Sequence, residues 1–236
     1  MKEQLLGTTL PVLSVSLDPG ESVVAETGEF SWMTDAIQMS TGLSEGSSLS
    51  LSIYTAKDAA GVIAFASKLP GSILGVGVGP QNEYLVHRHG FLAGTPGIEI
   101  SAGFQQSFSA GIFAGEGFVL QRVGGQGRAW IGLAGEVVTC NLAPGESLRT
   151  HPGHVGMFEG SVQFSITQVP GIANVAFGGD GFHLVALTGP GQVWLQSMPL
   201  PVLAHALEPY LARQNAPQAA ETGAIGGIIG DIMRGQ

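Results

Sequence analysis

The amino-acid sequence predicts an all-β fold built from three tandem repeats of short antiparallel strands, followed by a short C-terminal helix and tail. Glycine supplies 37 of the 236 residues, about twice its usual share, and many short strands require many turns. Apolar and polar residues alternate strictly over residues 162–167, as they do in a strand that packs one face against a core. Ordered segments also recur along the chain, which is typical of a repeat architecture.

The self-similarity has a consistent spacing. Residues 17–22 match residues 142–147 at an offset of 125, and a second pair of segments matches at an offset of 64, about half as large. A third copy is therefore expected between them. The segments that begin at Gly28, Gly90 and Gly153 supply it, because they lie 62 and 63 residues apart. We predict three β-repeats, which span 8–70, 71–134 and 135–198.

Glycine and proline mark the turns between the predicted strands. Pro-Gly pairs occur at 19–20 and 144–145, and they suit type II turns because proline presets φ and glycine accepts a positive φ. Other glycines flank the beginnings of predicted strands. The residues expected in turns are Pro19, Gly20, Gly28, Gly90, Gly115, Gly117, Gly127, Pro144, Gly145, Gly153, Gly179, Gly181 and Gly191.

The pattern changes after the third repeat. Leucines recur near helical spacing over 199–214, which predicts a C-terminal helix, and residues 215–236 read as a linker and a Gly/Ile-rich tail. An apolar stripe in the tail follows i, i+3, i+4, i+7 spacing, but the segment is too short to span a membrane. We expect either a flexible tail that rests weakly on the β domain or a docking peptide for a membrane surface or partner protein. Its candidate docking residues are Ile225, Ile228, Ile229 and Ile232.

The composition contains few charges. Lys and Arg number 9 and Asp and Glu number 18, so the net charge is −9 and charged residues make up only 11%, against about 25% in an ordinary domain. Nine scattered cations argue against binding to nucleic acid. So little charge also predicts that part of the surface is covered by copies of the same chain. Tandem β-units leave an unpaired strand edge at each end, and pairing with identical chains would close both.

Several segments together resemble the altered-inheritance-of-mitochondria protein 24 family. They are GESVVAETGEFSWM, GFLAGTPGIEI, FAGEGFVL, HVGMFEGSVQFSI and GPGQVWLQS. The resemblance covers about residues 5–212, although the stretch at 40–48 is shorter than the Gly-rich insertion of many relatives. It implies a fold of the double-stranded β-helix class, related to the tryptophan RNA-binding attenuation protein, with three repeats per chain and a homotrimer that forms a pseudo-ninefold ring. It implies no established enzyme activity and no cofactor.

Two histidines form the main candidate for a metal site. His87 and His89 have the i, i+2 spacing that places two side chains on one face of a strand, as in a cupin-like metal centre. A cupin would need a glutamate soon afterwards, but Glu99 lies too far along the chain. The alternative is that both are polar residues at the end of a strand, present in one repeat only.

Other signatures of catalysis are weak. Cys140 aligns with Val15 in the first repeat and is expected to be a small core residue rather than a nucleophile. A single cysteine forbids an internal disulfide, and no signal-peptide pattern opens the chain, so a cytoplasmic location is expected. The glycines at 75–79 are followed by Pro80 and not by a helix, so they form no dinucleotide loop.

The sequence therefore predicts a non-enzymatic, ring-forming scaffold or interaction protein with no metal or other cofactor. Its partners are expected to be itself, as a homotrimer, and an unidentified protein or membrane surface through the tail. The alternative is a small-ligand or metal-binding protein that uses His87 and His89. An RNA-binding ring, which the fold relationship would suggest, is disfavoured because the negative charge repels phosphate.

Overall fold

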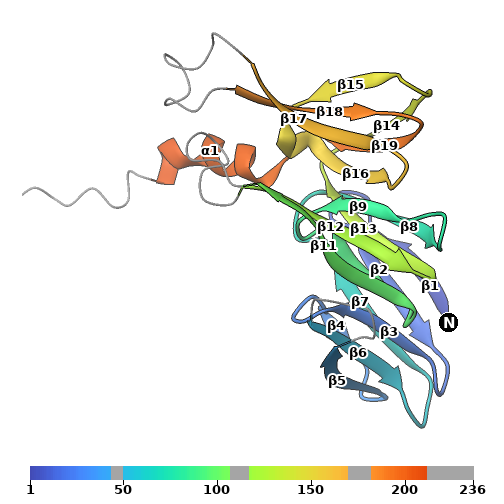
Figure 1. Ribbon diagram of the computed structural model, residues 1–236. Coiled ribbons are helices and arrows are strands. Elements are labelled where there is room, and N and C mark those ends of the chain that lie inside the picture. Colours follow the sequence, from blue (N-terminus) through green and yellow to red (C-terminus); the bar gives the residue numbers. More distant parts are fainter. Residues whose placement is uncertain (44–49, 107–116, 170–181, 212–236) are drawn as a thin grey trace, which may run out of the picture. The chain divides into compact units, whose positions relative to one another are not determined.

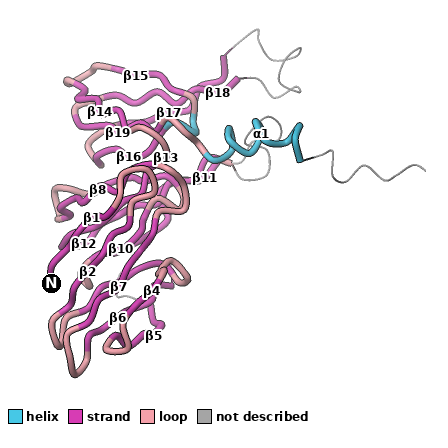
Figure 2. Tube along the Cα trace, turned by 180° about the vertical axis from the view of Figure 1, so that it is seen from behind, coloured by secondary structure: helices cyan, strands magenta, loops and turns pink. Residues whose placement is uncertain are grey.

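The computed structural model describes residues 1–43, 50–106, 117–169 and 182–211. Contacts divide the chain into two compact units, Met1–Val202 and Leu203–Gln236. Figures 1 and 2 show that the regular secondary structure of the described chain consists of strands, apart from a short 3-10 turn and one α-helix. The fold is thus all-β with a short C-terminal helix, as the sequence predicts. The helix α1 spans Leu200–Leu211, and residues 212–214 of the predicted helix lie outside the described residues.

Among the described residues, six strands fall within each predicted repeat. The first repeat contains β2 (Val12–Leu17), β3 (Ser22–Glu26), β4 (Trp32–Met33), β5 (Ile37–Leu43), β6 (Ser50–Ala56) and β7 (Gly61–Ala66). The second contains β8 (Gly71–Val78), β9 (Tyr84–His87), β10 (Phe91–Gly94), β11 (Ile98–Gln106), β12 (Phe118–Gly125) and β13 (Gly127–Ala134). The third contains β14 (Val137–Leu142), β15 (Ser147–Thr150), β16 (Val155–Glu159), β17 (Gln163–Val169), β18 (Phe182–Thr188) and β19 (Gly191–Gln196), with the 3-10 turn η1 (Pro152–His154) after β15.

The same antiparallel pairing recurs in every repeat. One half of each repeat is the three-stranded set β2-β7-β4, β8-β13-β10 or β14-β19-β16, and the other half is β3-β6-β5, β9-β12-β11 or β15-β18-β17. Neighbouring repeats are joined through the pairs β3–β10 and β9–β16. Each junction therefore merges half of one repeat with half of the next into a single six-stranded sheet.

One strand lies outside the predicted repeats. β1 (Lys2–Leu6) pairs with β2 along its own whole length, from Lys2 opposite Ser16 to Leu6 opposite Val12. The Glu3 carboxylate on β1 accepts hydrogen bonds from the Arg128 guanidinium at 2.7 Å and from the Trp130 indole N–H at 2.9 Å. The N-terminal strand thus connects the first repeat to the second, and the sequence pattern did not predict it.

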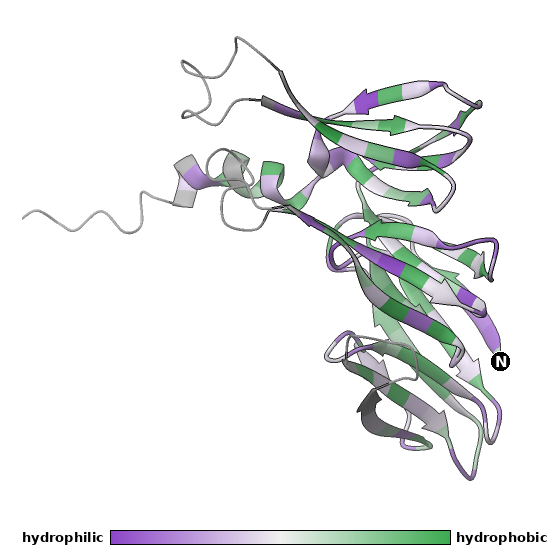
Figure 3. Ribbon diagram, viewed as in Figure 1, coloured by the Kyte–Doolittle hydropathy of each residue, from purple (hydrophilic) through white to green (hydrophobic). Residues whose placement is uncertain are grey.

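The buried core is continuous across repeat boundaries. Three clusters of buried apolar side chains fill the β domain. Trp130 and Leu92 of the second repeat pack in the cluster of the first, while Met157 of the third packs in the cluster of the second. Apolar and polar positions alternate along the strands in Figure 3. Because each core draws on at least two repeats, a repeat cannot bury its apolar face alone.

The two Pro-Gly turns have the local conformation that their sequence favours. Gly20 and Gly145 have φ values of +86° and +79°, which a type II turn requires at its third residue. Each turn also contains the same kind of capping hydrogen bond. The Glu21 carboxylate accepts the Asp18 N–H at 2.8 Å, and the Glu146 carboxylate accepts the Ala143 N–H at 2.9 Å. Gly115, Gly179 and Gly181 lie outside the described residues.

The repeat symmetry does not extend to every buried position. Leu13 and Val15 on β2 are fully buried, but Val138 at the matching position of β14 is 54% exposed, and Cys140 is half-buried against the third core cluster. Cys140 packs against the core, but the expectation that it is as buried as Val15 is wrong. β14 is the last strand of its sheet, whereas β2 has β1 on its outer side.

Candidate functional site

Two kinds of feature depart from the repeat plan of the β domain, namely unpaired strand edges and a pocket. The first unpaired edge is β4. In the second and third repeats the equivalent strands β10 and β16 are paired on both sides and their residues are mostly buried. β4 pairs only with β7 among the strands of the described residues. Trp32 on this strand is 54% exposed, so a large aromatic side chain lies at an unpaired sheet edge.

The second unpaired edge is β15. Its equivalents β3 and β9 pair with β10 and β16 of the following repeat, whereas β15 pairs only with β18 within the described chain. Arg149 is exposed on β15, but Val24 and Leu85 at the matching positions are 1% and 6% exposed. An arginine therefore stands where the inner repeats bury an aliphatic side chain at their junction.

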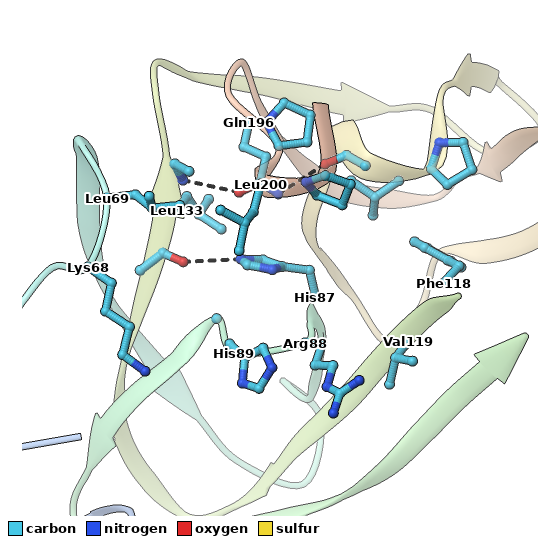
Figure 4. A pocket seen from close by; sticks show the side chains of 18 of the residues that line it. Lys68, Leu69, His87, Arg88, His89, Phe118, Val119, Leu133, Gln196 and Leu200 are labelled. Atoms are coloured by element: carbon cyan, nitrogen blue, oxygen red, sulfur yellow. Dashed lines mark hydrogen bonds between the residues drawn. The ribbon is translucent and has the colours of Figure 1, made fainter. Parts of the chain in front are cut away.

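The other feature is a pocket of about 390 Å³ within the β domain. Its walls come from all three repeats and from the start of α1. They include Lys68 and Leu69 after β7, His87, Arg88, His89 and Leu92 around the β9–β10 turn, and Leu133, Gln196 and Leu200. Figure 4 shows the Lys68, Arg88 and His89 side chains at one side of the His87 ring, and Leu69, Leu133 and Leu200 at the other.

The cationic side of the pocket is only partly neutralised. Lys68 forms an ion pair with Glu29, whose side chain is 12% exposed. The Arg88 backbone N–H donates to the Val119 carbonyl at 3.0 Å. Its guanidinium is exposed and has no ion pair within the described part of the chain. Two of the nine Lys and Arg residues of this acidic protein thus line one cavity.

The structure separates the two histidines that the spacing placed on one strand face. β9 ends at His87, and His89 lies in the following turn with a φ of +62°. The His87 ring Nε2 is 3.3 Å from the Gly132 carbonyl oxygen, and burial lowers the pKa of His87. Among the described residues no three His, Cys, Asp or Glu side chains group so that they could hold a metal ion. The prediction that both imidazoles share a strand face is therefore wrong.

Gln196 is a site residue that the sequence analysis missed. Its side chain is 5% exposed, and its Oε1 accepts the Ala134 N–H while its Nε2 donates to the Gly153 carbonyl, both at 3.0 Å. His154 Nδ1 contacts the Gln196 carbonyl oxygen at 2.8 Å. The amide thus ties the second repeat to the η1 turn at the pocket wall. The sequence signal that could have indicated this role is a glutamine at the end of an apolar strand.

Comparison with known proteins identifies the family. The family model described as mitochondrial biogenesis AIM24 matches residues 4–198, which include all three repeats. The chain belongs to the AIM24 family. No curated protein gives a significant match. Among solved structures, the crystal structure of a Streptococcus pyogenes protein superposes with a TM-score of 0.72 at 19% identity, over 89% of this chain and 99% of that one. At 19% identity this similarity shows a shared fold and nothing about function.

The C-terminal end of this AIM24-family chain contributes less to the site. The tail residues Ile225, Ile228, Ile229 and Ile232 lie outside the described residues. No described helix is long and apolar enough to cross a membrane. The candidate functional features of the family domain are therefore the two strand edges and the three-repeat pocket.

Proposed function

We propose that this AIM24-family protein assembles head to tail, β15 of one chain pairing with β4 of the next, into a closed ring that acts as a non-enzymatic scaffold. The observation that carries the proposal is the repeat rule of the sheet. β3 pairs with β10 and β9 pairs with β16, so the next pair in the series is β15 with the β4 of another copy. Such a pair would repeat the junction of the inner sheets across the boundary between chains, with β1 as an additional strand.

The side chains at the two edges support this pairing. In the β9–β16 junction, Met157 lies opposite Val86. Phe158 lies opposite Leu85 in the same junction, and Gly94 lies opposite Val24 in the β3–β10 junction. Met33 and Arg149 occupy these two positions on β4 and β15, so both junctions give a register with Arg149 opposite Met33 of the next chain. Trp32 would lie opposite Thr150, and its exposed edge would gain a neighbouring strand.

Closure of the chain series would remove both exposed edges. A head-to-tail interface is heterologous, and it forms a ring when the rotation closes and a filament when it does not. The AIM24 resemblance implies three chains, which would give nine repeats. The low content of charged residues, 11%, agrees with a surface that is partly covered in this way. The single Cys140 and the absence of disulfides suit a reducing compartment, and we propose the cytoplasm.

Mixing two defective variants tests the polarity of the interface. Trp32→Ala weakens the β4 edge and Arg149→Glu weakens the β15 edge, so each variant alone should be monomeric by light scattering. A mixture still contains one intact β4 edge and one intact β15 edge. It should therefore form a 1:1 dimer, which mass spectrometry of the native complex would detect. Val138→Ala, an exposed apolar residue on the edge strand β14, is the control that should leave the assembly unchanged.

The result distinguishes a head-to-tail assembly from a monomer and from an assembly with a symmetric interface. A wild-type protein that is monomeric at tens of micromolar would contradict the assembly. Variants that dissociate but do not complement each other would indicate a symmetric interface instead. The scaffold role itself predicts co-purifying partners from the native host, and deletion of residues 222–236 would tell whether the tail recruits a protein or a membrane surface.

The second candidate function is the binding of a small ligand, and the pocket beside His87 and His89 supports it. A cavity of about 390 Å³ lies within the usual range for ligand sites. Stoichiometric metal in the purified protein, lost in His87→Ala, would favour the metal-binding form of this alternative. A salt-dependent gel shift with RNA would instead support an RNA-binding ring, which the net charge of −9 disfavours.

A further inference from the structure

We infer that the three-repeat pocket is a binding site for a single-chain amphiphile with an anionic head, of the class of medium-chain fatty carboxylates. The inference does not depend on the ring, because every wall of the pocket belongs to one chain. It rests on the separation of apolar and cationic side chains within the cavity, on an arginine that has no ion pair among the described residues, and on a strained backbone at the cationic side.

The apolar part of the pocket suits a hydrocarbon chain. Leu69, Leu92, Phe118, Leu133, Val155 and Leu200 all line it. A volume of about 390 Å³ corresponds to about thirteen water-sized groups at roughly 30 Å³ each. A carboxylate of about ten carbons therefore fits the cavity, whereas a lipid with two long chains does not. The proposed occupant is thus a free amphiphile and not a bilayer lipid.

The cationic side selects the sign of the head group. Lys68 is paired with Glu29, so that pair contributes little net charge. Arg88 adds a positive charge with no ion pair among the described residues. A planar guanidinium can bind both oxygens of a carboxylate. A neutral or cationic head group would leave Arg88 uncompensated, and the pocket should discriminate against it.

The turn that carries Arg88 is held in an unusual conformation. His89 is the one described non-glycine residue with a positive φ, at +62°, a region that costs energy for an L-residue and is enriched at binding sites. In Figure 4 the His89 and Arg88 side chains extend from this turn to the same side of the pocket as Lys68. The strained turn thus presents two polar side chains at the mouth of an apolar cavity.

Titration calorimetry of the full chain with sodium decanoate, below its micelle concentration, tests the inference. We expect saturable binding of one decanoate per chain. Decanol and decyltrimethylammonium should bind at least tenfold more weakly. Arg88→Gln should weaken decanoate binding about tenfold, Arg88→Lys should restore part of it, and Lys57→Gln, which removes an exposed cation outside the pocket, should change nothing. Leu200→Asp, at a half-exposed pocket residue, should also weaken binding at least tenfold.

Three outcomes of the calorimetry would overturn the inference. They are the absence of saturable decanoate binding, equal binding of all three head groups, and wild-type affinity in Arg88→Gln. Binding to anionic phosphatidylglycerol vesicles without decanoate binding would also overturn it, in favour of a membrane headgroup. Trp32→Ala should bind decanoate normally, so that failure of the ring and failure of the pocket remain distinguishable.

Discussion

Trp32 and Met157 occupy the same position in the first and third repeats, yet Trp32 is 54% exposed and Met157 is fully buried. Each pairs with the equivalent residue of the closing strand, Trp32 with Ala64 and Met157 with Trp194. The difference arises on the other side, where β9 covers β16 and no described strand covers β4. Trp32 is therefore exposed because no described strand lies beside β4 in the way that β9 lies beside β16.

Replacement of Trp32 by alanine should weaken self-association. A tryptophan at the centre of an interface commonly contributes about 2 kcal/mol or more, which corresponds to about a 30-fold rise in the dissociation constant. Analytical ultracentrifugation over a concentration series would measure it, with Val138→Ala as the exposed apolar control. Because Trp32 is exposed in the single chain, thermal stability of the dilute protein should change little, and a large loss there would point to misfolding instead.

Replacement of Gln196 by alanine should lower the free energy of unfolding by about 3 kcal/mol. Its amide satisfies the Ala134 N–H and the Gly153 carbonyl, and each buried group left unpaired costs about 1–3 kcal/mol. Urea denaturation followed by circular dichroism would measure the loss. Gln192→Ala on the same strand breaks only an exposed contact to Asn141 and should cost less than about 0.5 kcal/mol. Equal losses would contradict the role of Gln196.

Two glycines on β8 should respond differently to alanine. A Cβ at Gly71 would lie 2.0 Å from the Leu133 carbonyl oxygen, whereas a Cβ at Gly77 meets no atom within 4 Å. Gly71→Ala should therefore destabilise the fold by about 2 kcal/mol or more, because backbone must move. Gly77→Ala should be neutral within about 0.5 kcal/mol. Thermal unfolding of the pair would decide, and a tolerated Gly71→Ala would contradict the β8–β13 packing.

Stability should fall as the solution is acidified through the histidine range. Burial lowers the pKa of His87 below the ordinary value of 6.5, and burial followed by the nearby His154 lowers that of His151. The unfolded chain then binds protons first, so stability is fully present above about pH 6.5 and is lost as the pH falls below it. His87→Gln, which can still donate to Gly132, should reduce this slope in urea denaturation between pH 7 and pH 5. An unchanged slope would contradict the burial of a neutral His87.

The repeat plan was predictable because its signals are local. The alternation over Val162–Thr167 appears as a strand whose apolar residues face inward, and the Pro-Gly pairs form turns with positive φ at Gly20 and Gly145. The position of His89 was not predictable from its spacing. Whether two residues share a strand face depends on where the strand ends, and β9 ends at His87 because a turn follows.

The sequence by itself determined the all-β class, the three repeats and the family, since strand periodicity, turn chemistry and ordered motifs are all written in short segments. Only the tertiary structure decided that β1 joins the first sheet, that β4 and β15 keep open edges within the described chain, and that Lys68, Arg88 and Gln196 meet around one cavity. These residues come from three repeats, and long-range pairing between strands brings them together. Pairing of that kind leaves no periodic signal in any one segment of the chain.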